Sequence, residues 1–112
     1  MRIGLVQVAA TTDPSANLEI VRTRAAQAAS LGAELVVFPE ATMCSFARPR
    51  ADAAEPFDGP WASGVREIAA ELGVTIVVGM FTTTDGPRVH NTLLITGGVE
   101  ARYDKVHLFD AL

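Results

Sequence analysis

Two charged residues stand in settings that favour function over simple solvation. Glu40 follows the apolar segment 34–38 and a proline, so it is expected just beyond the end of a buried strand. Ligands of open α/β sheets bind beyond the carboxyl ends of the strands, which makes Glu40 a candidate ligand-binding carboxylate. A helix-capping or solvated glutamate is the alternative.

Lys105 is the only lysine of the chain, and it lies among the aromatic and apolar residues of segment 103–109. A solvated lysine is less expected in such a setting, so Lys105 is the second candidate. Carboxylate and ammonium groups are side chains that transfer protons and stabilise negative charge. The alternative for Lys105 is a charge on an edge strand, which discourages aggregation.

Other familiar signatures of chemistry are absent from the sequence. The first strand is not followed by Gly-x-Gly-x-x-Gly, and no phosphate-binding Gly-x-x-x-x-Gly-Lys-Ser/Thr occurs, which disfavours nucleotide binding. His90 and His107 have no cysteine or carboxylate partners at metal-ligand spacing. We therefore expect both histidines to be structural and predict no metal site.

The elements that must position these residues alternate between strands and helices and then end in a hairpin. Three expected strands are apolar on both faces, as in sheets covered on both sides, and apolar residues at helical spacing lie between them. Turn and cap residues mark the ends of the helices and the hairpin. In chain order we expect a strand at 3–9, a helix from Asp13-Pro14 to Gly32, a strand at 34–38, a helix from Trp61 to Gly73, a strand at 74–80, and a hairpin of 89–96 with 99–106.

This β-α-β-α-β-β-β order predicts an α/β sheet with right-handed crossovers at its two helices. Two helices can leave one face of such a sheet uncovered, particularly when both lie on the same side. Residues 41–60 form a long connection, and connections of this length are often functional.

The composition is that of an ordinary globular domain, with 112 residues of which 49% are apolar and 20% charged. A net charge of -4 argues against general affinity for nucleic acid or anionic membranes. The single cysteine favours a reducing compartment, and we expect the cytoplasm. The apolar start is compatible with a signal peptide, but a buried first strand is favoured, and no transmembrane segment is expected.

The chain resembles the first part of the nitrilase superfamily of carbon–nitrogen hydrolases, most of which are amidases. The resemblance covers essentially the whole chain and includes the opening strand with Gln7. It implies an α-β-β-α sandwich, of which residues 1–112 would form an incomplete N-terminal portion, without metal or organic cofactor. The matching motifs are Asn17-Leu18-Glu19, Gly32-Ala33-Glu34-Leu35-Val36-Val37-Phe38, Phe38-Pro39-Glu40, His90-Asn91-Thr92 and Tyr103-Asp104-Lys105-Val106-His107-Leu108-Phe109-Asp110.

The resemblance assigns roles to the two charged residues within a Glu-Lys-Cys triad. By position, Glu40 matches the general base, which transfers protons to and from the reacting groups. Lys105 matches the cation that stabilises the tetrahedral oxyanion. Asn91 and Phe46 are the expected substrate-binding residues: Asn91 positions the loop around Glu40, with a purely structural role as the alternative, and Phe46 lies on the long connection.

The third member of the triad has no match in the sequence. The family's nucleophilic cysteine follows its lysine by some dozens of residues, whereas seven residues follow Lys105 here. Cys44 lies four positions after Glu40, where the family has a variable loop. We expect Cys44 to be a small residue near the pocket and not the nucleophile.

Two functional hypotheses follow. In the first, the chain is part of a hydrolase whose full-length form cleaves a small-molecule carboxamide, such as a short ω-amide, through a thioester. In the second, it is a truncated homologue without activity that acts as a binding or interaction subunit. We expect a homo-oligomer, and a flavodoxin-like ligand-binding domain is disfavoured because the phosphate-binding loop is absent.

Overall fold

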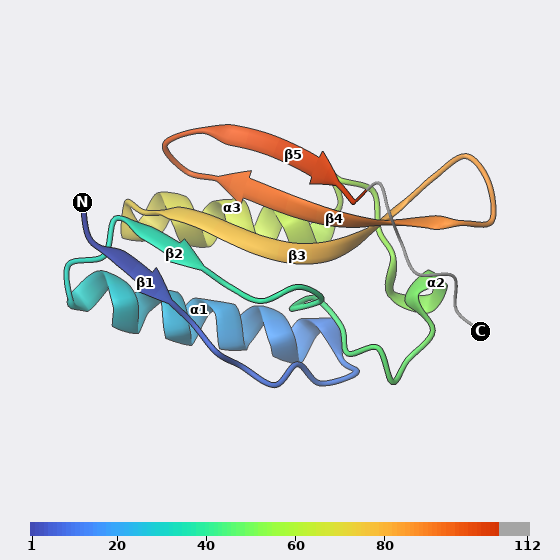
Figure 1. Cartoon of the computed structure of the whole chain (residues 1–112), viewed down its shortest axis with the longest axis horizontal. Coiled ribbons are helices and arrows are strands. Elements are labelled where there is room, and N and C mark those ends of the chain that lie inside the picture. The colour runs from blue at the N-terminus through green and yellow to red at the C-terminus, as the bar shows by residue number, and fades with distance from the viewer. Residues whose placement is uncertain (106–112) are drawn as a thin grey trace.

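The computed structural model describes residues 1–105, and its elements follow the predicted order with one addition (Figure 1). The addition is a short helix in the long connection. His107 lies outside the described residues, so its predicted structural role is not tested. In chain order the elements are β1 (Ile3–Leu5), α1 (Pro14–Ser30), β2 (Leu35–Val37), α2 (Arg50–Ala53), α3 (Pro60–Leu72), β3 (Thr75–Thr83), β4 (Val89–Thr96) and β5 (Glu100–Asp104).

Residues at the ends of the long helices act as their sequence predicts. The Asp13 side chain accepts a hydrogen bond from the Ser15 backbone N–H at 3.0 Å, and Pro14 follows as the first helical residue of α1. Gly73 ends α3 in the left-handed conformation, with a φ of 66°. Neither these helices nor α2 is long and apolar enough to cross a bilayer, and this finding is limited to residues 1–105.

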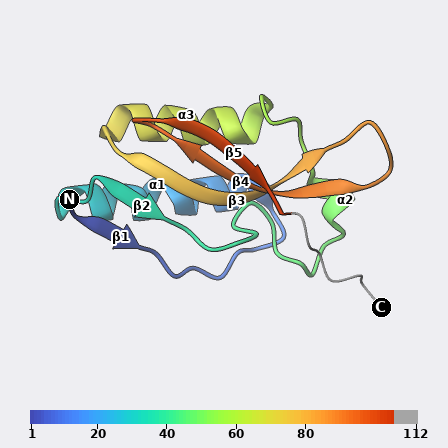
Figure 2. The ribbon, with the colours of Figure 1, turned by 45° about the horizontal axis from the view of Figure 1, so that its top comes forward.

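The strands within residues 1–105 form one five-stranded sheet in the order β1-β2-β3-β4-β5. β1, β2 and β3 are parallel neighbours, and β4 and β5 add to them in antiparallel fashion. The two helical connections advance along the sheet in the same direction, so right-handed crossovers place both helices on one face. Figures 1 and 2 show α1 and α3 together on that side of the sheet.

The hydrophobic core lies between this helical layer and one face of the sheet. Every second residue of the central strands points toward the helices, as the alternation of side chains in a strand requires, and most of these residues are fully buried. The buried members from the sheet are Val36, Ile76, Val78, Met80 and Leu94, and those from the helices are Val21, Ala25, Trp61, Val65 and Ile68.

The opposite face of the sheet, called the open face below, is apolar, and within residues 1–105 only the segment 40–46 covers part of it, over Gly79 and Phe81. Ile3 and Leu5 on β1 are 53% and 78% exposed, and Tyr103 on β5 is also exposed. This confirms the expectation that two helices leave one face without cover. The expectation of a buried first strand reaching Ala9 is wrong, because β1 is an edge strand whose ladder with β2 ends at Leu5 and Val37.

Candidate active site

The sheet topology brings three predicted residues to the same edge. The parallel strands β2 and β3 end there, and β5 runs in the direction of β3 because two antiparallel steps separate them. β4 runs the opposite way and therefore begins at this edge. Consequently Glu40 after β2, Asn91 near the start of β4 and Lys105 directly after β5 are neighbours in space.

Glu40 accepts hydrogen bonds from both of the other residues through one oxygen. The Asn91 Nδ2 lies 2.8 Å from Glu40 Oε1, and the Lys105 Nζ lies 3.1 Å from the same atom. Among residues 1–105, no hydrogen bond reaches Glu40 Oε2. That oxygen is therefore available to a further proton donor, such as a thiol or a water molecule.

The cluster lines an open cavity of about 330 Å³ on the open face, together with Gly79, Thr92, Leu93 and Tyr103. A volume of this size is typical of small-molecule sites. Asn91 is buried, whereas the side chains of Glu40 and Lys105 are about half exposed, at 50% and 43%. An ion pair with this exposure contributes about 0–1 kcal/mol to stability, so stability alone does not account for the arrangement.

Glu40 stands on a tight turn that directs its carboxylate over the sheet. The next residue, Ala41, has a φ of 60°, which is uncommon for a residue with a Cβ atom. The Thr42 hydroxyl donates to the Pro39 carbonyl at 2.6 Å and closes the turn. This hydrogen bond spans Ala41 and holds it in its uncommon conformation.

Gly79, at the centre of β3, permits this turn to approach the sheet. The Met43 backbone N–H donates to the Gly79 carbonyl at 3.1 Å, so the segment after Glu40 is bonded directly to the strand. We did not single out Gly79 from the sequence. A glycine inside an apolar strand is nevertheless a signal of close backbone approach, and it could have identified this position.

Phe46 lies on the same face of the sheet as Asn91. Its ring packs edge-on against Phe81, with ring centroids 5.8 Å apart, and its side chain remains 59% exposed. Phe81 pairs with Asn91 across the β3–β4 ladder, so both residues point to the open face. The expected contact of Phe46 with substrate stays a prediction. In this position Phe46 presents an exposed aromatic surface beside the cluster.

Cys44 is fully buried in the connection after Glu40. Its Sγ lies 3.7 Å from the carbonyl oxygen of Thr12 and 3.5 Å from that of Ser45. A reactive thiol needs partial exposure and a positive or basic neighbour. The environment of Cys44 is that of a small packing residue.

The side chains that commonly bind metals do not gather into a metal site within residues 1–105. In that range, no three His, Cys, Asp or Glu side chains are placed so that they could hold a metal ion. His90 instead lies beside Arg102 and Asp104, with its Nδ1 3.2 Å from Arg102 Nη2 and 3.3 Å from Asp104 Oδ2. These contacts place His90 in a polar network between β4 and β5, and its structural role stays a prediction.

The sequence and the fold together identify a known class of protein. Residues 2–112 match the model of the carbon-nitrogen hydrolase family, and the chain belongs to that family as the N-terminal portion of its domain. A hydrolase of Mycobacterium tuberculosis is 53% identical, with 99% of this chain and 41% of that protein aligned. The chloroplastic omega-amidase of Arabidopsis thaliana is 31% identical, with 96% of this chain and 32% of that protein aligned.

Solved structures give the same result. A CN-hydrolase superfamily protein from Xanthomonas campestris superposes with a TM-score of 0.83 at 33% identity, over 97% of this chain and 42% of that chain. An amidase from Nesterenkonia sp. superposes with a TM-score of 0.77 at 29% identity, over 99% of this chain and 44% of that chain. This chain thus spans less than half the length of each of these proteins, and the predicted family and fold class are confirmed.

Proposed function

We propose that Glu40 and Lys105 are the general base and the oxyanion-stabilising cation of an amidase that hydrolyses a small-molecule carboxamide. The observation that carries the proposal is the sharing of Glu40 Oε1 by Asn91 and Lys105, at 2.8 and 3.1 Å, beside an open cavity. The named relatives with an omega-amidase or amidase description support the substrate class.

The nucleophile in this proposal is a cysteine thiol from outside residues 1–112. Cys44 is unsuited because it is fully buried. In a mutant of the amidase from Nesterenkonia sp. AN1, acrylamide adds to the active-site cysteine, which supports the same type of nucleophile here. Glu40 Oε2, which accepts no hydrogen bond from the described residues 1–105, is the atom that would accept the proton of this thiol.

The reaction then proceeds in two halves. Glu40 takes the thiol proton while sulfur attacks the carboxamide carbon, and the Lys105 ammonium stabilises the oxyanion of the tetrahedral intermediate. The intermediate collapses to a thioester as Glu40 protonates the departing ammonia or amine. Glu40 next deprotonates a water molecule that attacks the thioester, and the carboxylic acid leaves as the thiol regains its proton.

The open face supports a second part of the proposal. In an α-β-β-α sandwich, a second sheet covers this apolar face, and we place that sheet outside residues 1–112. This second sheet would exclude water from the half-exposed pair of Glu40 and Lys105. Electrostatic stabilisation of an oxyanion is stronger in a site from which water is excluded. The same face is also what an inactive interaction subunit would use, so only an activity measurement separates the two functions.

The test is ammonia release from short carboxamides, and from the matching nitriles, by the protein in its full natural length. We expect turnover of carboxamides, and a loss of about 10²–10³ in kcat for Lys105→Met, because one oxyanion-stabilising donor is removed. Arg88→Met is the matched control, since Arg88 is an exposed cation on the β3–β4 turn. Absence of carboxamide turnover, or equal activity of the two variants, would refute the proposal.

A further inference from the structure

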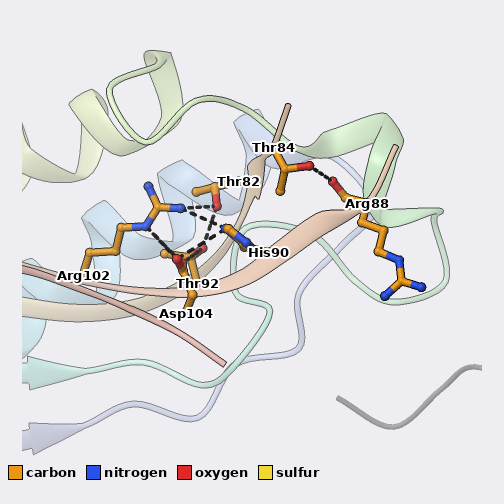
Figure 3. A network of polar contacts seen from close by, with 7 residues as sticks. All are labelled: Thr82, Thr84, Arg88, His90, Thr92, Arg102 and Asp104. Carbon is orange, nitrogen blue, oxygen red and sulfur yellow. Dashed lines mark hydrogen bonds and ion pairs between the residues drawn. The ribbon is translucent and has the colours of Figure 1, made fainter. Parts of the chain in front are cut away.

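The site-proximal end of β5 is tied to β4 by a network of polar side chains (Figure 3). The Thr92 hydroxyl donates to Asp104 Oδ1 at 2.8 Å, and the Arg102 Nε lies 3.0 and 3.2 Å from the two Asp104 carboxylate oxygens. Arg102 Nη2 also donates to the Thr82 hydroxyl at 2.9 Å and contacts His90 Nδ1 at 3.2 Å. We call Thr92, Arg102 and Asp104 the near clamp.

The other end of β5 has the same construction. The Thr96 hydroxyl donates to Glu100 Oε1 at 2.6 Å, and Arg66 Nη2 lies 3.1 Å from Glu100 Oε2. We call these three residues the far clamp. The guanidinium carbons of Arg66 and Arg102 lie 4.8 and 4.9 Å from the centroid of the Phe57 ring, so one aromatic side chain contacts both clamps.

Only the near clamp is adjacent to the candidate active site. Thr92 and Asp104 are directly opposite each other in the β4–β5 ladder. One residue beyond this pair, Lys105 lies opposite Asn91, and the Lys105 backbone N–H donates to the Asn91 carbonyl at 2.9 Å. Side chains alternate between faces, so the side chains of the clamp point to the helical side of the sheet, whereas those of Asn91 and Lys105 face Glu40. A shift of the β4–β5 register by one residue would turn the Lys105 side chain to the helical side of the sheet, away from Glu40.

We propose that the near clamp positions Lys105 for its contact with Glu40, an inference that rests on the proposed role of these two residues. The half-exposed ion pair of Glu40 and Lys105 is too weak to fix the end of a strand, where ladders open most readily. The cross-strand bond from the Thr92 hydroxyl to the Asp104 carboxylate is charge-assisted, and such bonds are shorter and stronger than neutral ones. The bonds of Arg102 to both oxygens of Asp104 lie within β5 and orient this carboxylate.

The ionisation of Asp104 is consistent with this role. Partial burial alone would raise the pKa of Asp104, but the hydrogen bonds from Arg102 and Thr92, together with electrostatic interactions with Arg102 and His90, lower that pKa below its ordinary value of 3.8. Asp104 is therefore charged at neutral pH, as its bonds with Arg102 require.

The inference is tested in the full-length protein labelled with ¹³C-lysine, in which comparison with Lys105→Arg assigns the Lys105 signals. The variant is Asp104→Asn, and the matched control is Glu100→Gln in the far clamp. In the wild type and the control we expect an NOE between the Lys105 Hε and the Asn91 Hδ2 protons, together with two inequivalent Hε signals. In Asp104→Asn we expect the NOE to be lost and the two Hε signals to merge.

Thr92→Val provides a second test that does not change any charge. It removes the hydroxyl donor and keeps a β-branched side chain, so the strand is preserved, and we expect the Lys105–Asn91 NOE to weaken. Persistence of the NOE in both Asp104→Asn and Thr92→Val, or its equal loss in Glu100→Gln, would overturn the inference.

A kinetic measurement separates this inference from the proposed function. We expect kcat for carboxamides to fall about 10- to 100-fold in Asp104→Asn with KM nearly unchanged, because small displacements of a catalytic group are costly. The Glu100→Gln control should keep the wild-type kcat. If the wild type hydrolyses no carboxamide, the proposed function fails, and the NOE comparison alone decides whether the near clamp positions Lys105.

Discussion

Gly79 lies directly beneath Glu40. A Cβ atom on Gly79 would stand 2.9 Å from the Cα of Glu40 and 2.6 Å from the backbone nitrogen of Ala41. Both are backbone atoms, which cannot move aside as the end of a flexible side chain can. The absence of a side chain at this one position in β3 therefore allows the Glu40 turn to rest on the sheet beside Asn91.

Gly79→Ala is expected to displace the Glu40 turn. We predict a loss of about 1–3 kcal/mol in the free energy of unfolding, the usual cost of forcing a methyl group into a filled space. We also predict a fall in carboxamide turnover. Urea unfolding measures the first effect, with Gly86→Ala as the control, because a Cβ atom on Gly86 would meet nothing within 4 Å. Equal stability of the two variants would show that Gly79 has no such role.

Local signals in the sequence predicted much of the fold. Asp13-Pro14 and Gly73 mark helix ends because capping depends only on neighbouring residues, and the structure confirms both. The order of strands and helices and the uncovered sheet face follow from hydrophobic periodicity and crossover handedness. The extent of β1 could not be predicted, because it depends on where its neighbour β2 ends.

The residues that position the candidate site were harder to predict than the residues of the site itself. Glu40 and Lys105 were recognisable from their own settings in the sequence. The near clamp was not, because a bond between Thr92 and Asp104 depends on the register of two strands, which no local pattern specifies. The additional helix α2 is only four residues long and has no amphipathic period to reveal it.

Phe46→Ala is expected to weaken substrate binding with little effect on the chemical step. Phe46 is exposed and packs edge-on against the buried Phe81, so its removal takes apolar surface from the side of the cluster and uncovers one edge of Phe81. We predict that KM for carboxamides rises about tenfold, or ~1.4 kcal/mol, and that kcat stays nearly constant. Leu31→Ala, at the exposed end of α1, is the control. A wild-type KM in Phe46→Ala would remove Phe46 from the substrate site.

Cys44→Ala is expected to retain activity, because the buried Cys44 thiol is not the nucleophile of the proposed reaction. We predict kcat within about twofold of the wild type and a loss of about 1 kcal/mol in unfolding free energy, typical of a mild core truncation. Steady-state ammonia release and urea unfolding measure these two quantities. A folded Cys44→Ala protein without turnover would instead identify Cys44 as the nucleophile.

The clamp carboxylates are expected to make stability depend on acid pH. Burial raises the pKa values of Asp104 and Glu100, but hydrogen bonds and nearby arginines outweigh it, so both values are lower in the folded state than their ordinary 3.8 and 4.5. At pH values above their ordinary pKa values, both carboxylates contribute their full stabilisation. This contribution is lost as the pH falls through their lower pKa values in the folded state. Urea midpoints measured from pH 6 to 3 should fall less steeply in Asp104→Asn than in the wild type. Equal slopes would contradict this prediction.

The central claim is that Glu40 moves protons during carboxamide hydrolysis, and the most direct measurement is kcat for Glu40→Gln in the full-length protein. Glutamine keeps the shape of the side chain and an oxygen for Asn91 and Lys105 but cannot serve as a base. We predict that kcat falls by about 10²–10⁴, the usual contribution of a general base, while Glu67→Gln on the exposed side of α3 keeps the wild-type rate. Wild-type turnover by Glu40→Gln would contradict the account.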